Sequence, residues 1–105
     1  MIINPTDFPD IGPLGQVTND ALRRIGMNVE LVATDWGTVV QRRASREPVE
    51  RGGWSIFHTT AAGDALMTPP IHLFLRSNGA DAWFGWPDDP EIERLRAAWL
   101  DASAM

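Results

Sequence analysis

The residues best suited to chemistry follow a short apolar run near the middle of the chain. Trp54–Phe57 forms this run, and His58, Thr59 and Asp64 come after it with only small or hydroxylated residues between them. In an open α/β sheet, ligands bind just beyond the carboxyl ends of the strands. A strand that ends in these side chains therefore predicts a ligand site, although an ordinary surface loop has the same spacing.

The order of these residues does not favour catalysis. His58 adjoins Thr59 on an expected strand, and neighbours on a strand point to opposite faces, so the two side chains cannot readily hydrogen-bond as in a hydrolytic triad. The sequence contains no G-x-S-x-G elbow and no phosphate-binding glycine loop. There is no cysteine, and no second histidine lies close to His58. We expect no catalytic residue, no metal and no cofactor.

A second group with binding chemistry is the aromatic segment near the C-terminus. Trp83, Phe84 and Trp86 lie close together in a chain that has five tryptophans and no tyrosine. Such side chains can stack on a solute, cover a small core or face another part of a larger protein. The sequence leaves these alternatives open. Trp54, in contrast, is expected in the core because it begins an otherwise buried strand.

Composition limits the class of protein. The 105 residues are 44% hydrophobic and 22% charged, as in a globular domain or part of one. The net charge of −5 argues against a nucleic-acid partner, because nucleic acids are bound through clustered positive charge. No apolar run approaches the length needed to span a membrane.

The elements that would position these residues alternate along the chain. Strands are expected at Ile2–Asn4, Asn28–Ala33 and Trp54–His58, with crossover helices at Leu14–Ile25 and Asp35–Arg46. Crossovers of this kind are right-handed and give parallel strands. The pattern predicts an α/β fold of three parallel strands with helices on both faces.

Several local features are expected within this frame. The helix after the second strand should be capped by Thr34 or Asp35, with Arg42, Arg43 and Arg46 on its solvent side. A one- or two-turn helix is expected at Ile71–Arg76. The final helix should begin at Pro90, with Asp88 as a presumed cap. Its buried stripe is predicted to consist of Ile92, Leu95 and Trp99.

Four segments carry a resemblance to a known family. They are Ile25–Leu31 followed by Asp35-Trp36, then Gly52–Thr59, Asn78–Pro87 and Pro90–Leu95. In the same order, they resemble segments of the peptide/nickel class of extracellular solute-binding proteins, the receptors of ABC importers. The resemblance covers nearly the whole chain but only part of such a receptor. Together with the alternation of strands and helices, it implies a periplasmic-binding-protein-like half lobe whose first strand lies between the other two, in the order 2-1-3. This half lobe is a single partial domain, residues 1–105, from the C-terminal lobe.

The resemblance also implies a function and its partners. Such receptors are not enzymes; they hold a peptide or similar small solute between two lobes and dock on membrane permease subunits. The implied location is periplasmic, with the signal peptide and the N-terminal lobe outside these residues. In many peptide-binding members an Asp shortly after the strand pairs with the amino terminus of the ligand, and Asp64 is nearest that position.

A different function is also compatible with the sequence. The chain could be a stand-alone interaction module that docks another protein through an exposed aromatic patch at Trp83–Trp86. Under either function, an unshielded apolar patch favours self-association. We therefore expect a dimer or a higher species at high concentration, with some of Trp83, Phe84 and Trp86 buried in it.

Overall fold

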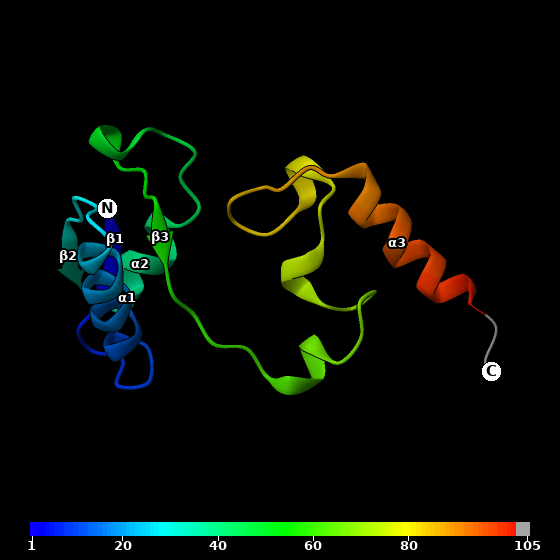
Figure 1. The fold of residues 1–105 in the computed structure, drawn as a ribbon, viewed down its shortest axis with the longest axis horizontal. Helices are drawn as coiled ribbons and strands as arrows, with labels where there is room; N and C mark the ends of the chain where they lie inside the picture. Colours follow the sequence, from blue (N-terminus) through cyan, green and yellow to red (C-terminus); the bar gives the residue numbers. More distant parts are fainter. Residues whose placement is uncertain (103–105) are drawn as a thin grey trace. The chain divides into compact units, whose positions relative to one another are not determined.

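The computed structural model describes residues 1–102 and divides the chain into two compact units, Met1–Thr60 and Ala61–Met105. Each unit is described by itself. The first contains, in chain order, β1 (Ile2–Pro5), α1 (Gly12–Arg24), β2 (Leu31–Thr34), α2 (Trp36–Arg42) and β3 (Ile56–Phe57) (Figure 1). A 3₁₀ turn, η1 (Val49–Arg51), precedes β3. The predicted alternation of strand and helix is confirmed.

The sheet has the predicted topology. Its three strands are parallel in the order β2-β1-β3, so β1 is central. Ile2 pairs with Leu31 on one side and with Ile56 on the other. Because the two crossovers run in opposite directions across the sheet, right-handed connections place α1 and α2 on opposite faces. The third strand is shorter than expected: only Ile56 and Phe57 pair with β1.

The core of the first unit is built around β1. All four residues of this strand are buried, and Ile2 and Ile3 have no exposed surface. Ile11, Val29 and Val39 complete the buried apolar set. Both helices contact β1, and a strand that is paired on two sides and covered in this way is buried on both faces, here with Asn4 as its one polar residue.

Helix α1 contacts the sheet through glycine rather than through its large apolar residues. Gly12 and Gly15 are buried, whereas Leu14, Val17 and Ile25 at the predicted helical spacing are exposed. A Cβ atom at Gly15 would lie 2.0 Å from Asn4 Oδ1 and 3.2 Å from Asn4 Cβ, so a larger residue there would require the Asn4 side chain to move. The helix ends at Arg24 with Ile25 as its cap, and Gly26 follows at φ +93°, a conformation that favours glycine.

Helix α2 is capped as expected but is shorter. Asp35 accepts a hydrogen bond from the Thr38 backbone N–H at 2.9 Å, and the helix ends at Arg42 rather than Arg46. The expectation that Arg42 and Arg43 are solvated is wrong. Arg42 Nε donates to Gly53 O at 2.9 Å, and the Arg43 guanidinium lies over the rings of Trp36 and Phe57, at 5.7 and 5.9 Å from their centroids. Both side chains are half-buried because the segment before β3 folds back over them.

The second unit consists of short turns and one longer helix. Its elements are η2 (Gly63–Leu66), η3 (Leu73–Leu75), η4 (Gly79–Asp81) and α3 (Pro90–Asp101). The helix expected at Ile71–Arg76 is therefore a single 3₁₀ turn. Asp89, not Asp88, caps α3, since Asp89 Oδ1 accepts from the Glu91 and Ile92 N–H groups at 3.0 and 3.3 Å. Pro90 is the first residue of the helix, as predicted.

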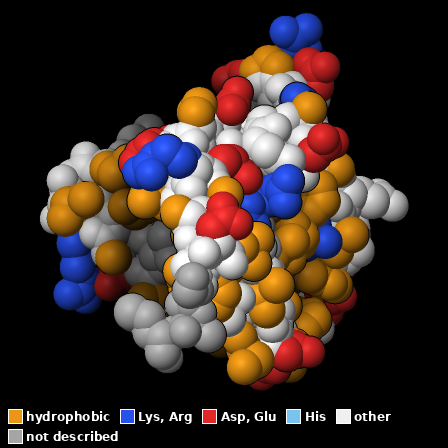
Figure 2. Space-filling view, turned by 90° about the vertical axis from the view of Figure 1, so that its right-hand side faces the viewer, with side chains coloured by type: hydrophobic (Ala, Val, Ile, Leu, Met, Phe, Trp, Pro, Cys, Tyr) orange, Lys and Arg blue, Asp and Glu red, His pale blue; other side chains and the backbone are white. Residues whose placement is uncertain are grey.

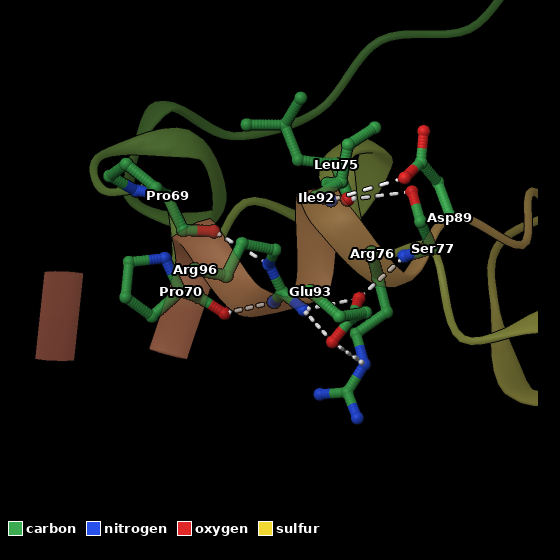
Figure 3. A network of polar contacts seen from close by, with 9 residues as sticks. All are labelled: Pro69, Pro70, Leu75, Arg76, Ser77, Asp89, Ile92, Glu93 and Arg96. Carbon is green, nitrogen blue, oxygen red and sulfur yellow. Dashed lines mark hydrogen bonds and ion pairs between the residues drawn. The ribbon is translucent and has the colours of Figure 1, made fainter. Parts of the chain in front are cut away.

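The inward face of α3 differs from the predicted apolar stripe. Arg96 is buried, with 7% of its surface exposed, while Leu95 and Trp99 are 53% and 49% exposed. Arg96 donates to the Pro69 and Pro70 carbonyl oxygens and to Glu93, and Glu93 Oε1 accepts from the Ser77 N–H at 2.6 Å (Figure 3). These polar contacts turn the Glu93–Arg96 side of the helix inward. The stripe of Leu95 and Trp99 therefore stays exposed.

Apolar side chains remain at the surface of this unit. They include Ile71, Leu73, Leu75, Leu95, Trp99 and Leu100. The face drawn in Figure 2 shows hydrophobic side chains interspersed with charged ones. In the part of the chain that the structure describes, no helix has both the length and the apolar character required to cross a membrane.

Candidate functional site

The loops after β1 and β2 meet at the carboxyl edge of the sheet. Thr6 N–H donates to Thr34 O at 2.8 Å, which ties the end of β1 to the end of β2. Asp7 Oδ1 then accepts from the Trp36 N–H at 2.7 Å, and the rings of Phe8 and Trp36 lie 5.2 Å apart. These two loops therefore lie together at one edge of the sheet. Parallel strands place their following loops at one edge, and this is the edge that binds ligands in open α/β sheets.

Asp35 is at this edge, but its side chain is used in the fold. Its carboxylate accepts from the Thr38 hydroxyl at 2.5 Å as well as from the Thr38 N–H. These hydrogen bonds lower the pKa of Asp35, the one from the Thr38 side chain most, and so keep the cap ionised. Asp35 is thus a helix cap, as expected.

His58 follows β3 and is held by α1. Its Nε2 lies 2.8 Å from the Thr18 hydroxyl, and its Nδ1 is buried with no hydrogen-bond partner among the described residues. Burial lowers the pKa of His58, because the charged imidazolium loses solvation. The imidazole therefore favours the neutral form, in which one ring nitrogen can donate and the other can accept.

Lowering the pH should destabilise the first unit through His58. Its pKa is lower in the folded chain than the ordinary value of about 6.5 in the unfolded chain, so the unfolded state binds more protons as the pH falls through 6.5. The free energy of unfolding should then decrease with falling pH and level off below the lowered pKa. Urea unfolding of the chain and of His58→Gln over this range measures the effect. A slope that persists unchanged in His58→Gln would assign it to other groups.

The remaining residues of the predicted site after β3 differ in their environment. Thr59 is half-buried and its hydroxyl donates to Thr60 O at 3.4 Å, a long contact. Asp64 is exposed in the first turn of η2 and forms no hydrogen bond or ion pair within residues 1–102. His58 and Thr59 belong to the first unit and Asp64 to the second.

The aromatic segment forms a chain of edge-to-face contacts in the second unit. Phe74 contacts Trp83 at 5.3 Å between ring centroids, Trp83 contacts Phe84 at 4.9 Å, and Phe84 contacts Trp86 at 6.3 Å. The turn that presents them has Gly85 at φ +103° and Trp86 at φ +47°. Left-handed backbone is unusual for a large residue and is held here by the hydrogen bond from Trp86 N–H to Trp83 O at 2.7 Å. All three side chains of the segment are half-buried.

Trp54 is used in packing, as expected. Its Nε1 donates to Arg43 O at 3.0 Å, and its ring meets Phe57 edge-on at 4.8 Å.

Sequence reasoning missed a group of polar residues in the second unit. His72, Arg76, Asn78 and Asp81 line a cavity there together with Trp83 and Arg96. No motif marks them, because they come from two short turns and the segments next to those turns. Among residues 1–102, no group of three or more His, Cys, Asp or Glu side chains has the arrangement of a metal site.

Comparison with known proteins bears on the resemblance. No family model matches the chain. All 105 residues align at 42% identity with a probable peptide ABC transporter periplasmic-binding protein of Sinorhizobium fredii (strain NBRC 101917 / NGR234). The chain spans 20% of the length of that relative.

The class of protein follows from the sheet and this alignment together. A three-stranded parallel sheet in the order β2-β1-β3, flanked by helices, is the predicted half-lobe arrangement. The predicted resemblance is confirmed: over its whole length the chain is similar to a segment of a periplasmic solute-binding protein of an ABC transporter.

Proposed function

We propose that this chain is part of the C-terminal lobe of a periplasmic receptor that binds a peptide or similar small solute for an ABC importer. The observation that carries the proposal is the 42% identity along the whole chain to a protein named as such a receptor. In this role the chain binds and does not catalyse. Its partners are the ligand, the permease subunits and the N-terminal lobe. The alternative of a stand-alone interaction module is not favoured by this similarity.

The proposed binding residues follow β3 in the first unit or lie in the second unit. They are His58, Thr59, Asp64, Trp83, Phe84 and Trp86. Asp64 is the strongest of them, because a carboxylate without an internal partner can form an ion pair with a ligand amino group. The small residues before it, Ala61, Ala62 and Gly63, permit close approach of a ligand.

Asp64→Asn in the receptor that contains this chain should weaken binding of tri-alanine by well over tenfold. The reason is that removing one partner of a charge pair in a closed cleft costs about 2–5 kcal/mol. N-acetylated tri-alanine has no ammonium group, so it should bind the Asp64→Asn variant and the unaltered receptor with the same affinity. Isothermal titration calorimetry with both peptides measures the difference.

Asp88→Asn is the matched control. Asp88 is exposed, lies in the same unit and does not cap α3. Tri-alanine should bind this variant as it binds the unaltered receptor. Wild-type affinity in Asp64→Asn would remove Asp64 from the site and leave the aromatic segment Trp83–Trp86 as the proposed contact.

Self-association of the 105-residue chain is a further part of the proposal. The expected interface was the segment Trp83–Trp86, whose side chains are half-buried within the second unit. The exposed Leu95, Trp99 and Leu100 on α3 supply the apolar surface for association instead. Sedimentation velocity at increasing concentration should show a rising mean mass. A clean monomer at every concentration would contradict this.

A further inference from the structure

The dipeptide Asn78-Gly79 in the second unit has the sequence in which asparagine loses its side-chain amide most readily. In this reaction the backbone nitrogen of the following residue attacks the side-chain carbonyl carbon, and glycine hinders the approach least because it has no Cβ. The chain has four asparagines, and the other three precede Pro5, Asp20 and Val29. Asn78 is therefore the one asparagine whose neighbour leaves the reaction unhindered.

The reaction consumes water and releases ammonia. The Gly79 nitrogen loses its proton and bonds to Asn78 Cγ, the Cγ–Nδ2 bond breaks, and Nδ2 leaves as ammonia with the proton that Gly79 lost. Water then breaks the bond between the ring nitrogen of this succinimide and one of its two carbonyl carbons. Cleavage at Cγ gives an aspartate. Cleavage at the main-chain carbonyl gives an isoaspartate, in which the chain runs through the former side chain.

In the folded second unit the attacking nitrogen is already occupied. Gly79 N–H donates to Pro87 O at 2.9 Å. Asn78 itself pairs with Asp88 in an antiparallel bridge, and a Cβ atom at Gly79 would lie 3.5 Å from Asp88 Oδ2. A hydrogen-bonded N–H beside a carboxylate loses its proton less readily, because the resulting anion faces a like charge. Attack on Asn78 therefore requires this turn to open.

The carbonyl group that would be attacked is closed off as well. Asn78 Oδ1 is buried, and no residue in the described part of the chain donates a hydrogen bond to it. Attack at Cγ places a negative charge on this oxygen, and a buried charge without a donor is strongly disfavoured. The burial that leaves Oδ1 without a partner therefore slows the reaction in the folded chain.

We propose that Asn78 is a site of spontaneous deamidation that the folded second unit keeps closed and that reacts when the turn around it opens. Because the reacting form is the open one, the rate follows the fraction of chains in which the turn is open. This site goes beyond the proposed function and is independent of it, since neither Asn78 nor Gly79 is among the proposed binding residues.

Either product should disfavour closing of the turn. An aspartate at position 78 faces Asp88 across the bridge, and like charges directly opposite each other are destabilising. An isoaspartate adds one carbon to the main chain between Ser77 O and Gly79 N–H. These two groups bond to Asp89 N–H and Pro87 O, each at 2.9 Å, and the longer chain cannot form both hydrogen bonds in the same register. Opening of the turn thereby becomes irreversible.

The test is incubation of the 105-residue chain at mildly alkaline pH, with and without guanidinium chloride, followed by peptide mapping with mass spectrometry. Asn78 should be converted in the denaturant and at least about tenfold more slowly without it, because hydrogen bonds of the turn must break before the reaction. Methylation by an isoaspartyl methyltransferase identifies the isoaspartate. Asn28 is the internal reference: it is exposed but precedes the β-branched Val29, so it should stay unmodified in both samples.

Arg96→Met should open the site in the absence of denaturant. Arg96 holds Glu93, whose Oε1 accepts from the Ser77 N–H at 2.6 Å next to the site (Figure 3). The substitution should raise the deamidation rate without denaturant about tenfold and leave the rate in guanidinium chloride unchanged. Arg94→Met is the matched control, because Arg94 pairs with Glu91 in an exposed contact that contributes little. Its rate should equal that of the unaltered chain.

The proposal is overturned if Asn78 reacts equally fast with and without denaturant, or if Asn28 reacts as fast as Asn78 in the denatured chain. Equal rates in Arg96→Met and Arg94→Met without denaturant would also overturn it, because opening of the turn would then not govern the reaction. If Arg96→Met does not fold, it should react at the rate of the denatured chain, so the test remains decisive.

Discussion

Gly53→Ala should destabilise the first unit by about 3 kcal/mol, the upper range for an overpacked side chain. Gly53 is buried, and a Cβ atom there would lie 1.8 Å from Glu47 O and 2.9 Å from the Pro48 carbonyl carbon. These are backbone atoms, so no side-chain rotation can relieve the overlap. The Glu47–Gly53 loop would have to open, and with it the hydrogen bond from Gly53 N–H to Pro48 O at 2.9 Å.

Gly52 provides a control, because it is required for its backbone conformation and not for close packing. Gly52 has φ +91°, and a Cβ atom there meets nothing within 4 Å. Gly52→Asn should cost little, because asparagine tolerates left-handed backbone. Urea unfolding followed through the amide signals of β1 compares the two variants. Equal losses of stability, or none in Gly53→Ala, would contradict the close approach of the two backbone segments.

The same pair of glycines shows what the sequence can and cannot reveal. Two consecutive glycines before an apolar run indicate a change of chain direction, and the turn before β3 confirms this. Which glycine is needed for its φ angle and which for close packing depends on the distance from Gly53 to Glu47, and that distance arises only in the folded chain. For the same reason, the sequence does not reveal that α1 packs on the sheet through Gly15. The spacing of Leu14 and Val17 suggests an apolar face, but both residues are exposed.

The sheet was predictable because its signals are local. Each expected strand is a short apolar run, each crossover has a helical period or a cap, and the handedness rule then leaves few topologies. The strand order β2-β1-β3 needed the family resemblance as well, because right-handed crossovers alone also permit the order 1-2-3. The length of β3 could not be predicted in this way. The pairing of Ile56 and Phe57 with β1 depends on the path of the loop that leads from Gly53 into the strand.

The candidate site was predictable only in part. Spacing after a strand predicts His58 as a binding residue, but its contact with Thr18 joins residues 40 positions apart and has no signal in the sequence. The cavity residues His72, Arg76 and Asn78 carry no spacing signal, because 3₁₀ turns and single residues bring them together. The apolar period of α3 predicted the wrong inward face, since the hydrogen-bonding needs of the Pro69 and Pro70 carbonyls outweighed the burial of Leu95 and Trp99.

Arg96→Met should destabilise the second unit by about 3 kcal/mol, since it removes the donors that join α3 to the Pro69-Pro70 turn. Arg96 Nε donates to Pro69 O at 3.0 Å, and its Nη1 contacts both carboxylate oxygens of Glu93 at 2.9 and 3.1 Å. A methionine side chain has similar length but cannot donate, so two carbonyl oxygens lose their partner. Glu93 keeps only the Ser77 N–H and the long contact with Arg76.

Hydrogen exchange of the Ser77 and Asp89 amides reports this loss locally. Ser77 N–H is bonded to Glu93 Oε1, and Asp89 N–H donates to Ser77 O at 2.9 Å, so both amides depend on where Glu93 is held. Their protection should fall strongly in Arg96→Met and hardly in Arg94→Met, because the Arg94 pair with Glu91 is exposed and such pairs contribute little. Equal protection in the two variants would show that the turn and the helix hold together without Arg96. In that case the hydrogen bonds of the buried Arg96 guanidinium would not explain why Leu95 and Trp99 are exposed on α3.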